Sequence, residues 1–158
     1  MPTWFTDDPD FVPPPSETRA VLTVLSETLD ADELVGLVGM APDRRWERGA
    51  KADPAGRYSG IQIRARLPDD AEPSAILSDL LERLEPITRN VTALVLDERV
   101  RVQIGLAHHI ENWNPGFSFS ADQLERLAEL GAGLELDIYT YPGPADPPES
   151  WPPHETRR

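Results

Sequence analysis

The amino-acid sequence predicts a single α+β domain, and two recurring patterns lead to this prediction. In residues 61–67, 100–107 and 134–139, apolar and polar side chains alternate one by one, which is typical of strands with one buried face. Between these segments, leucine-rich stretches repeat their apolar residues every three or four positions, as helices that pack on a sheet do. The two patterns follow each other along the chain, so strands and helices are mixed in one fold.

The strand patterns differ in how many faces they bury. Residues 18–25 are rich in Val, Leu and Thr and carry apolar side chains on both faces, which indicates a central strand. Residues 61–67 alternate, which indicates one buried and one solvated face. Residues 92–96 and 100–107 are separated only by residues 97–99, which favours a hairpin.

Three helices are predicted from their start and stop signals. Residues 30–33 (Asp-Ala-Asp-Glu) form a variant of the capping box, and the helix that follows ends near Gly39. Pro73 suits the first turn of a second helix, which ends at Pro86. Residues 120–123 (Ser-Ala-Asp-Gln) form a capping box for the third.

The resulting order is β-α-β-α-β-β-α-β. From Ser59 onward it is βαββαβ, the ferredoxin-like order, which predicts an antiparallel sheet with helices on one face. The first strand and helix extend this unit at its N-terminal side. Prolines concentrate at both ends, so we expect Pro-rich arms at residues 1–17 and 142–158 around one domain at residues 18–141. Both arms carry aromatic residues, so we expect them to lie along the domain.

Composition excludes several classes of function. The chain has 28 acids against 15 bases, a formal charge of −13, which argues against nucleic-acid and anionic-membrane ligands. The absence of cysteine excludes disulfides, thiol nucleophiles and Fe–S clusters. The N-terminal residues show no secretory signal and the longest apolar run is too short to span a bilayer, so we expect a cytoplasmic protein. No phosphate-binding, nucleophile-elbow or zinc-protease motif is present, and no cofactor is predicted.

A series of short motifs occurs in a fixed order along the chain. The series consists of Leu29-Asp30-Ala31-Asp32-Glu33-Leu34, Trp46-Glu47-Arg48-Gly49, residues 77–84 with Pro86, Ser120-Ala121-Asp122-Gln123-Leu124 and Leu134-Glu135-Leu136-Asp137-Ile138-Tyr139. It resembles the bacterial DUF4279 family, small proteins of undefined function, over roughly residues 18–141. Where the resemblance leads us to expect a Trp opening the second strand, this chain has Tyr58-Ser59-Gly60. The resemblance implies an architecture and no catalytic residues.

The loop and strand at residues 41–67 are basic on an otherwise acidic chain, with seven bases against three acids. Arginines in such a place can bind a phosphate or carboxylate through two parallel hydrogen bonds, or can neutralise the protein's own acids. The polar face of the predicted sheet adds further Arg, Tyr and carboxylate side chains, which suit either a ligand face or cross-strand ion pairs. The ligand-binding candidates are Trp46, Arg64, Arg66, Arg101, Asp137 and Tyr139.

The first functional hypothesis is a non-catalytic cytosolic binding protein with an acidic protein–protein surface, of which an immunity or antitoxin-type neutraliser is one form. Its negative charge would steer it to a basic partner protein. The partner-binding candidates are Asp79, Glu82, Glu125, Glu129 and Trp113. The alternative is a sensor of a small anionic ligand, which would use the basic loop and the polar sheet face.

An enzyme is the third hypothesis, and we predict no catalytic residues. His109, Glu111 and Asp137 form its only conceivable acid–base set, and His108, His109 and Glu111 form the only possible metal cluster. Neighbouring residues on a strand point to opposite faces, however, so both histidines can bind one metal only if the strand has ended before them. We therefore predict no metal site. The oligomeric state is not assigned from the sequence.

Overall fold

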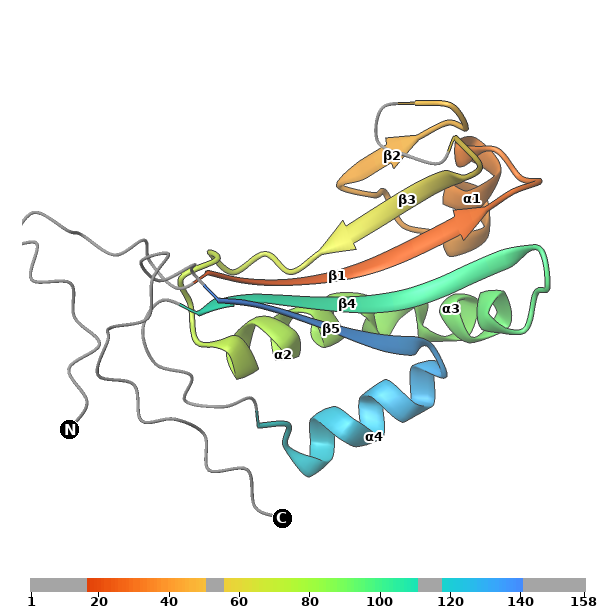
Figure 1. Ribbon diagram of the computed structural model, residues 1–158. Helices are drawn as coiled ribbons and strands as arrows, with labels where there is room; N and C mark the ends of the chain where they lie inside the picture. Colours follow the sequence, from red (N-terminus) through yellow and green to blue (C-terminus); the bar gives the residue numbers. More distant parts are fainter. Residues whose placement is uncertain (1–16, 51–55, 111–117, 141–158) are drawn as a thin grey trace, which may run out of the picture.

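A computed structural model describes residues 17–50, 56–110 and 118–140 of the chain. It contains one five-stranded sheet in the order β2-β3-β1-β4-β5, with helices on one side of it (Figure 1). The strands are β1 (Glu17–Ser26), β2 (Arg44–Trp46), β3 (Ser59–Arg64), β4 (Val100–Ile110) and β5 (Gly133–Thr140). The α-helices are α1 (Ala31–Val38), α2 (Pro73–Leu84), α3 (Thr88–Val95) and α4 (Ala121–Leu130), with a 3₁₀ turn at Glu85–Ile87.

The sheet is antiparallel except at one edge. β1 is the central strand and pairs antiparallel with both β3 and β4, and β2 pairs antiparallel with β3. β5 pairs parallel with β4, and α4 makes the crossover between them. In this register Arg64 of β3, Val21 of β1, Gly105 of β4 and Glu135 of β5 form one row across four strands.

The expected hairpin of residues 92–96 and 100–107 is wrong in its first half. Residues 92–95 belong to helix α3, so the order from Ser59 is β-α-α-β-α-β and the sheet lacks the ferredoxin-like connectivity. Burial explains the difference, because Val91 and Leu94, three positions apart, both enter the core. The Thr92 hydroxyl also donates to the backbone carbonyl of Thr88, as threonines in helices commonly do. Packing of this face overrides the strand preference of the β-branched residues.

The predicted helix starts are confirmed. Asp30 caps α1 in a capping box with Glu33, Gly39 ends it in the left-handed conformation, and Ser120 caps α4 with Gln123. The basic loop before β3 contains the short edge strand β2. The two Pro-rich arms lie outside the described residues, except for Glu17, which begins β1, and most of the segment between β4 and α4 lies outside them as well.

The core lies between the sheet and the helices. Every second side chain of β1 is buried, from Thr18 to Ser26, and so are Ile61 and Ile63 of β3 and Ile104 of β4. α1 packs on β3, α2 on β1 and α3 on β4, whereas α4 packs on α2 and α3. The opposite face of the sheet is covered by no helix of the described part of the chain, and it remains open (Figure 1).

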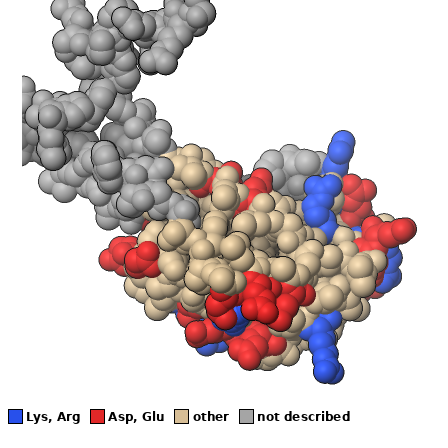
Figure 2. Space-filling model, turned by 90° about the horizontal axis from the view of Figure 1, so that it is seen from below, with Lys and Arg blue, Asp and Glu red and all other residues tan. Residues whose placement is uncertain are grey.

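The helical side of the molecule is acidic. Asp and Glu side chains cluster on it, and most basic side chains seen from this side project from its periphery (Figure 2). The open sheet face, in contrast, combines arginines with carboxylates. None of the helices in the described ranges is long and apolar enough to cross a membrane.

Candidate functional site

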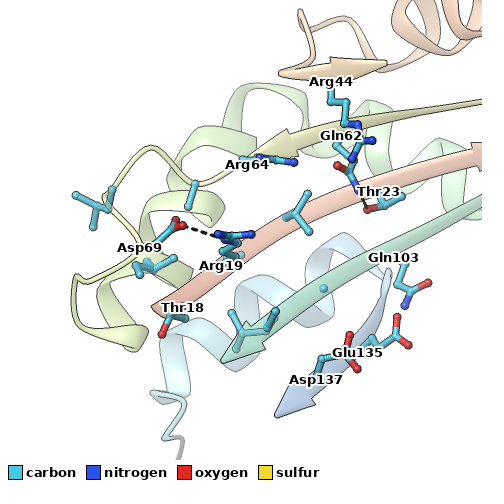
Figure 3. Close-up of a pocket in the computed structure, with 18 residues that line it drawn as sticks. Thr18, Arg19, Thr23, Arg44, Gln62, Arg64, Asp69, Gln103, Glu135 and Asp137 are labelled. Atoms are coloured by element: carbon cyan, nitrogen blue, oxygen red, sulfur yellow. Dashed lines mark hydrogen bonds and ion pairs between the residues drawn. The ribbon is translucent and has the colours of Figure 1, made fainter. Parts of the chain in front are cut away.

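The open sheet face is hollowed into a depression of about 510 Å³ (Figure 3). Its floor is made of small or short side chains on the two central strands, such as Val21, Gly105 and Ala107. Its polar lining residues are Thr18, Arg19, Thr23, Arg44, Gln62, Arg64, Asp69, Gln103, Glu135 and Asp137. Because consecutive side chains of a strand alternate between faces, the buried residues of β1 and β4 place their neighbours in this depression.

Three arginines border the depression, and one of them, Arg19, is paired with a carboxylate. Nε of Arg19 donates to Oδ2 of Asp69 over 2.9 Å, and this hydrogen bond raises the pKa of the Arg19 guanidinium. Arg44 and Arg64 form no ion pair with any residue in the described ranges. The positive charge available to a ligand therefore comes from Arg44 and Arg64.

A side-chain clamp fixes the strand that carries Arg64. The Asp43 carboxylate accepts from the backbone N–H of Arg64 over 2.7 Å and from Nη2 of Arg83 on α2 over 3.1 Å. Arg83 also donates to the Arg64 carbonyl, over 2.6 Å. Burial raises the pKa of the Asp43 carboxyl, but the hydrogen bonds from Arg83 and the Arg64 backbone outweigh it, so the pKa lies below its ordinary value. The backbone of Arg64 is thus held while its side chain faces the depression.

Arg44 is positioned by an aromatic ring. Its guanidinium lies over the indole of Trp46, 5.6 Å from the ring centroid. The indole in turn lies against Gly60 of β3, where an added Cβ would come within 2.3 Å of a ring carbon. Glycine at position 60 therefore lets the Trp46 ring lie against β3, with the Arg44 guanidinium over it.

Besides Asp69, two carboxylates line the depression, and both lie on β5, across the sheet from Arg44 and Arg64 (Figure 3). Glu135 and Asp137 are exposed, and neither forms an ion pair in the part of the chain that the structure describes. Between the two sets of charges lie uncharged polar groups, with Nε2 of Gln62 donating to the Thr23 hydroxyl over 3.3 Å. The site thus has a cationic end at Arg44 and Arg64 and an anionic end on β5, and the one arginine between them, Arg19, is paired with Asp69.

The structure brings together only part of the predicted ligand set. Arg64 and Asp137 line the depression, and Trp46 supports Arg44 beside it. The other three lie outside its lining: Arg66 follows the end of β3, Arg101 lies over the Tyr58 ring at 5.9 Å, and Tyr139 stacks on His109 at 4.8 Å.

Sequence reasoning missed Arg19 and Arg44 as site residues. Arg19 is a single charge inside residues 18–25, which we expected to be apolar on both faces, and that charge marks the open face of the central strand. Arg44 lies in a strand of only three residues, which is too short to give a recognisable alternation.

The predicted partner-binding acids separate into different environments. Glu82 and Glu129 line one groove of about 530 Å³ between α2 and α4, together with Glu85 and Asp122. Arg126 is the one base among its lining residues, with Nη2 3.8 Å from Oε2 of Glu85.

The remaining predicted acids lie outside that groove. Asp79 accepts from the backbone N–H groups of Arg66 and Leu67, which fixes the chain after β3. Glu125 is exposed on α4 but is not a lining residue. Trp113 lies outside the described residues.

His108 and His109 point to opposite faces of β4. His108 is buried on the helical side, with Nδ1 2.8 Å from the Thr18 hydroxyl. Burial, followed by the charge of His109, lowers the pKa of the His108 imidazole. His109 is exposed on the open face, and Glu111 lies outside the described residues. No group of three or more metal-binding side chains occurs among the residues that the structure describes.

Comparisons with known proteins identify a family but no function. Neither the search of curated proteins nor the search of solved structures finds a match. The profile of the family described as "Domain of unknown function (DUF4279)" matches residues 16–141, which include all the strands and helices described above. The chain therefore belongs to the DUF4279 family.

Proposed function

We propose that this protein is a non-catalytic binding protein and that its open sheet face holds a small ligand with an anionic group. The observation that carries the proposal is the pair Arg44 and Arg64, two arginines without an ion-pair partner in the described ranges, at one depression of an acidic protein. A guanidinium binds a carboxylate or phosphate through two parallel hydrogen bonds, so two of them favour such a group.

Three neighbouring arginines bind groups of the protein itself. Arg45 pairs with Asp32, and Arg48 donates to the Glu27 carbonyl, so both are used within the fold. Arg83 is only 11% exposed and is committed to Asp43. Arg44 and Arg64 differ from these three because both line the depression and neither forms an ion pair in the described ranges, although the charge of Arg64 helps to lower the pKa of Asp43.

The test compares Arg64→Gln with Arg66→Gln. Each removes one charge from the same stretch of chain, but only Arg64 lines the depression. With inorganic phosphate and succinate as probes, we expect thermal shift and calorimetry to show anion binding that Arg64→Gln weakens about tenfold and Arg66→Gln leaves unchanged. Equal losses in both variants would mean that the anions respond to overall charge, and the proposal would fail.

The acidic groove between α2 and α4 favours a second candidate, a neutraliser of a basic partner protein. Four carboxylates and one base line this groove; the carboxylates are those of Glu82, Glu85, Asp122 and Glu129. An acidic surface of this kind accelerates encounter with a basic protein and does so less at high salt.

This second candidate is tested with a lysine-rich probe peptide at low and high salt. The double variant Glu82→Gln/Glu129→Gln should lower the association rate at low salt, and Glu98→Gln, an exposed acid on the turn before β4, should not. If all variants associate at one rate, the groove does not guide a basic partner.

A further inference from the structure

The charges of the open sheet face are separated along the rows of the sheet. Arg64 on β3 and Glu135 on β5 lie at the two ends of one row, with Val21 and Gly105 between them. Arg44 and Asp137 belong to the neighbouring rows on either side. Each end of the depression therefore has two groups of one sign. Between the ends, the Arg64 row carries only Val21 and Gly105, and the Asp137 row carries Arg19, whose charge is paired with Asp69.

The two ends are too far apart to neutralise each other. Three steps between neighbouring strands, at about 4.8 Å each, separate the Cα atoms of Arg64 and Glu135 by roughly 14 Å. Neither arginine forms an ion pair with Glu135 or Asp137, although long side chains could shorten that distance. A ligand with one charge would satisfy one end and leave the other unused.

We propose that the ligand is amphoteric: its anionic group binds Arg44 and Arg64, and its cationic group binds Glu135 and Asp137. This inference rests on the proposed function and names its ligand class. An extended chain advances about 3.3–3.6 Å per residue, so a tripeptide with free ends carries its two charges roughly 10 Å apart. That separation is shorter than the roughly 14 Å between the Cα atoms of Arg64 and Glu135, so their side chains need to span only the remaining few ångströms.

The middle of the depression suits the backbone of such a molecule. Gln62, Thr23 and Gln103 lie in one row of the sheet and offer amide and hydroxyl groups. The carbonyl oxygen of the Gln62 side chain is buried and has no hydrogen-bond partner among the described residues, so a turn of this amide would let it accept a hydrogen bond from a ligand N–H. The small side chains of Gly105 and Ala107 leave room above the floor.

Four glycine-based probes separate the two charges: triglycine, N-acetyl-triglycine, triglycine amide and free glycine. By calorimetry, we expect triglycine to bind, and we expect loss of either terminal charge to weaken binding about tenfold. Glycine, which is too short to reach both ends, should bind more weakly than triglycine. A linear amino-carboxylate of the same length distinguishes a peptide ligand from another amphoteric molecule, and its binding also supports the inference.

Two variants assign the ligand's charges to the two ends. Asp137→Asn should weaken triglycine but not N-acetyl-triglycine, because the second probe has no cation left to bind. Arg64→Gln should weaken triglycine but not triglycine amide, for the corresponding reason. Asp70→Asn, an exposed acid outside the depression, is the charge-matched control for Asp137→Asn.

The outcomes distinguish this inference from the proposed function. If N-acetyl-triglycine binds as tightly as triglycine and depends on Arg64, the face binds anions only; the amphoteric ligand is then wrong and the proposed function stands. If neither the amphoteric probes nor phosphate and succinate bind, both proposals fail.

Discussion

β4 and β5 are neighbouring parallel strands with the same alternation of apolar and polar side chains, yet they are buried very differently. Leu106 of β4 is 1% exposed, whereas its register partner Leu136 on the same face of β5 is 45% exposed. Leu134 and Ile138 of β5 are also exposed, at 40% and 51%. The difference arises because α3 packs on β4, whereas α4 packs on α2 and α3. Alternation predicts a strand, and only the helix layer decides whether its apolar side is buried.

The largest expected effect contrasts these two register partners. Leu106→Ala removes a fully buried side chain and should lower the free energy of unfolding by about 2–5 kcal/mol. Leu136→Ala removes a side chain that is about half exposed and should cost about 1 kcal/mol or less. Urea unfolding of both variants measures the difference. Equal losses would show that β5 is covered as well as β4.

The next effect concerns the opposite edge of the sheet, where Asp43 and Arg83 hold β3 to α2. Asp43→Asn leaves the largely buried Arg83 guanidinium without its carboxylate, so we expect the free energy of unfolding to fall by about 1–2 kcal/mol. The loss is small for a buried charged group because Asp43 is partly exposed and water screens the pair. Asp70→Asn should change little. A wild-type stability for Asp43→Asn would show that the clamp contributes nothing.

The same pair predicts a dependence on pH. The pKa of Asp43 is lowered in the folded state, so its contribution is complete above the ordinary carboxyl pKa of about 4 and is lost as the pH falls through the folded value. The difference in unfolding free energy between wild type and Asp43→Asn should therefore shrink in acid. A difference that stays constant down to the acid limb would contradict this assignment.

A smaller effect on stability distinguishes His108 from His109, which lie on opposite faces of β4. The pKa of buried His108 is lowered, so the unfolded chain binds a proton more readily and stability should decline as the pH falls below about 6.5. His108→Gln should reduce this decline, and His109→Gln, on the open face, should leave most of it. Unfolding curves at neutral and mildly acidic pH give the measurement; an unchanged decline in His108→Gln would overturn the assignment.

The smallest effect on stability belongs to two glycines of the open face. An added Cβ at Gly105 would lie 3.4 Å from Cγ1 of Val21, and at Gly133 it would meet nothing within 4 Å, so valine at either position should change stability by less than about 1 kcal/mol. Only Gly105 lines the depression. Calorimetry should therefore show that Gly105→Val abolishes the binding of triglycine and that Gly133→Val retains it. Binding retained by both would place the ligand elsewhere.

The local elements were predictable because their signals are local. Caps at Asp30 and Ser120, and the alternation in residues 100–107, depend on neighbours within a few residues. Residues 92–95 were not predictable in this way, because their strand-forming side chains become helical through contacts of α3 with β4 and α4.

For the candidate site, the face of the sheet was predictable, but the position of the depression on that face was not. Arg64 and Asp137 were expected on one polar surface, and they do lie in one depression. Arg101 and Tyr139 share that face but lie outside the depression, because position along a strand depends on a register that one sequence does not contain. Arg19 contributes through the open face of a strand expected to be buried on both sides.

We propose that the open sheet face, and not the acidic helical face, binds a small charged ligand. Backbone amide chemical shifts, followed by NMR during titration with triglycine and with phosphate, test it most directly. We expect the amide signals of Arg64, Gly105 and Glu135 to shift together and to saturate, and those of Glu82 and Glu129 to stay unchanged. Shifts confined to α2 and α4, or no saturable shift on the sheet, would contradict it.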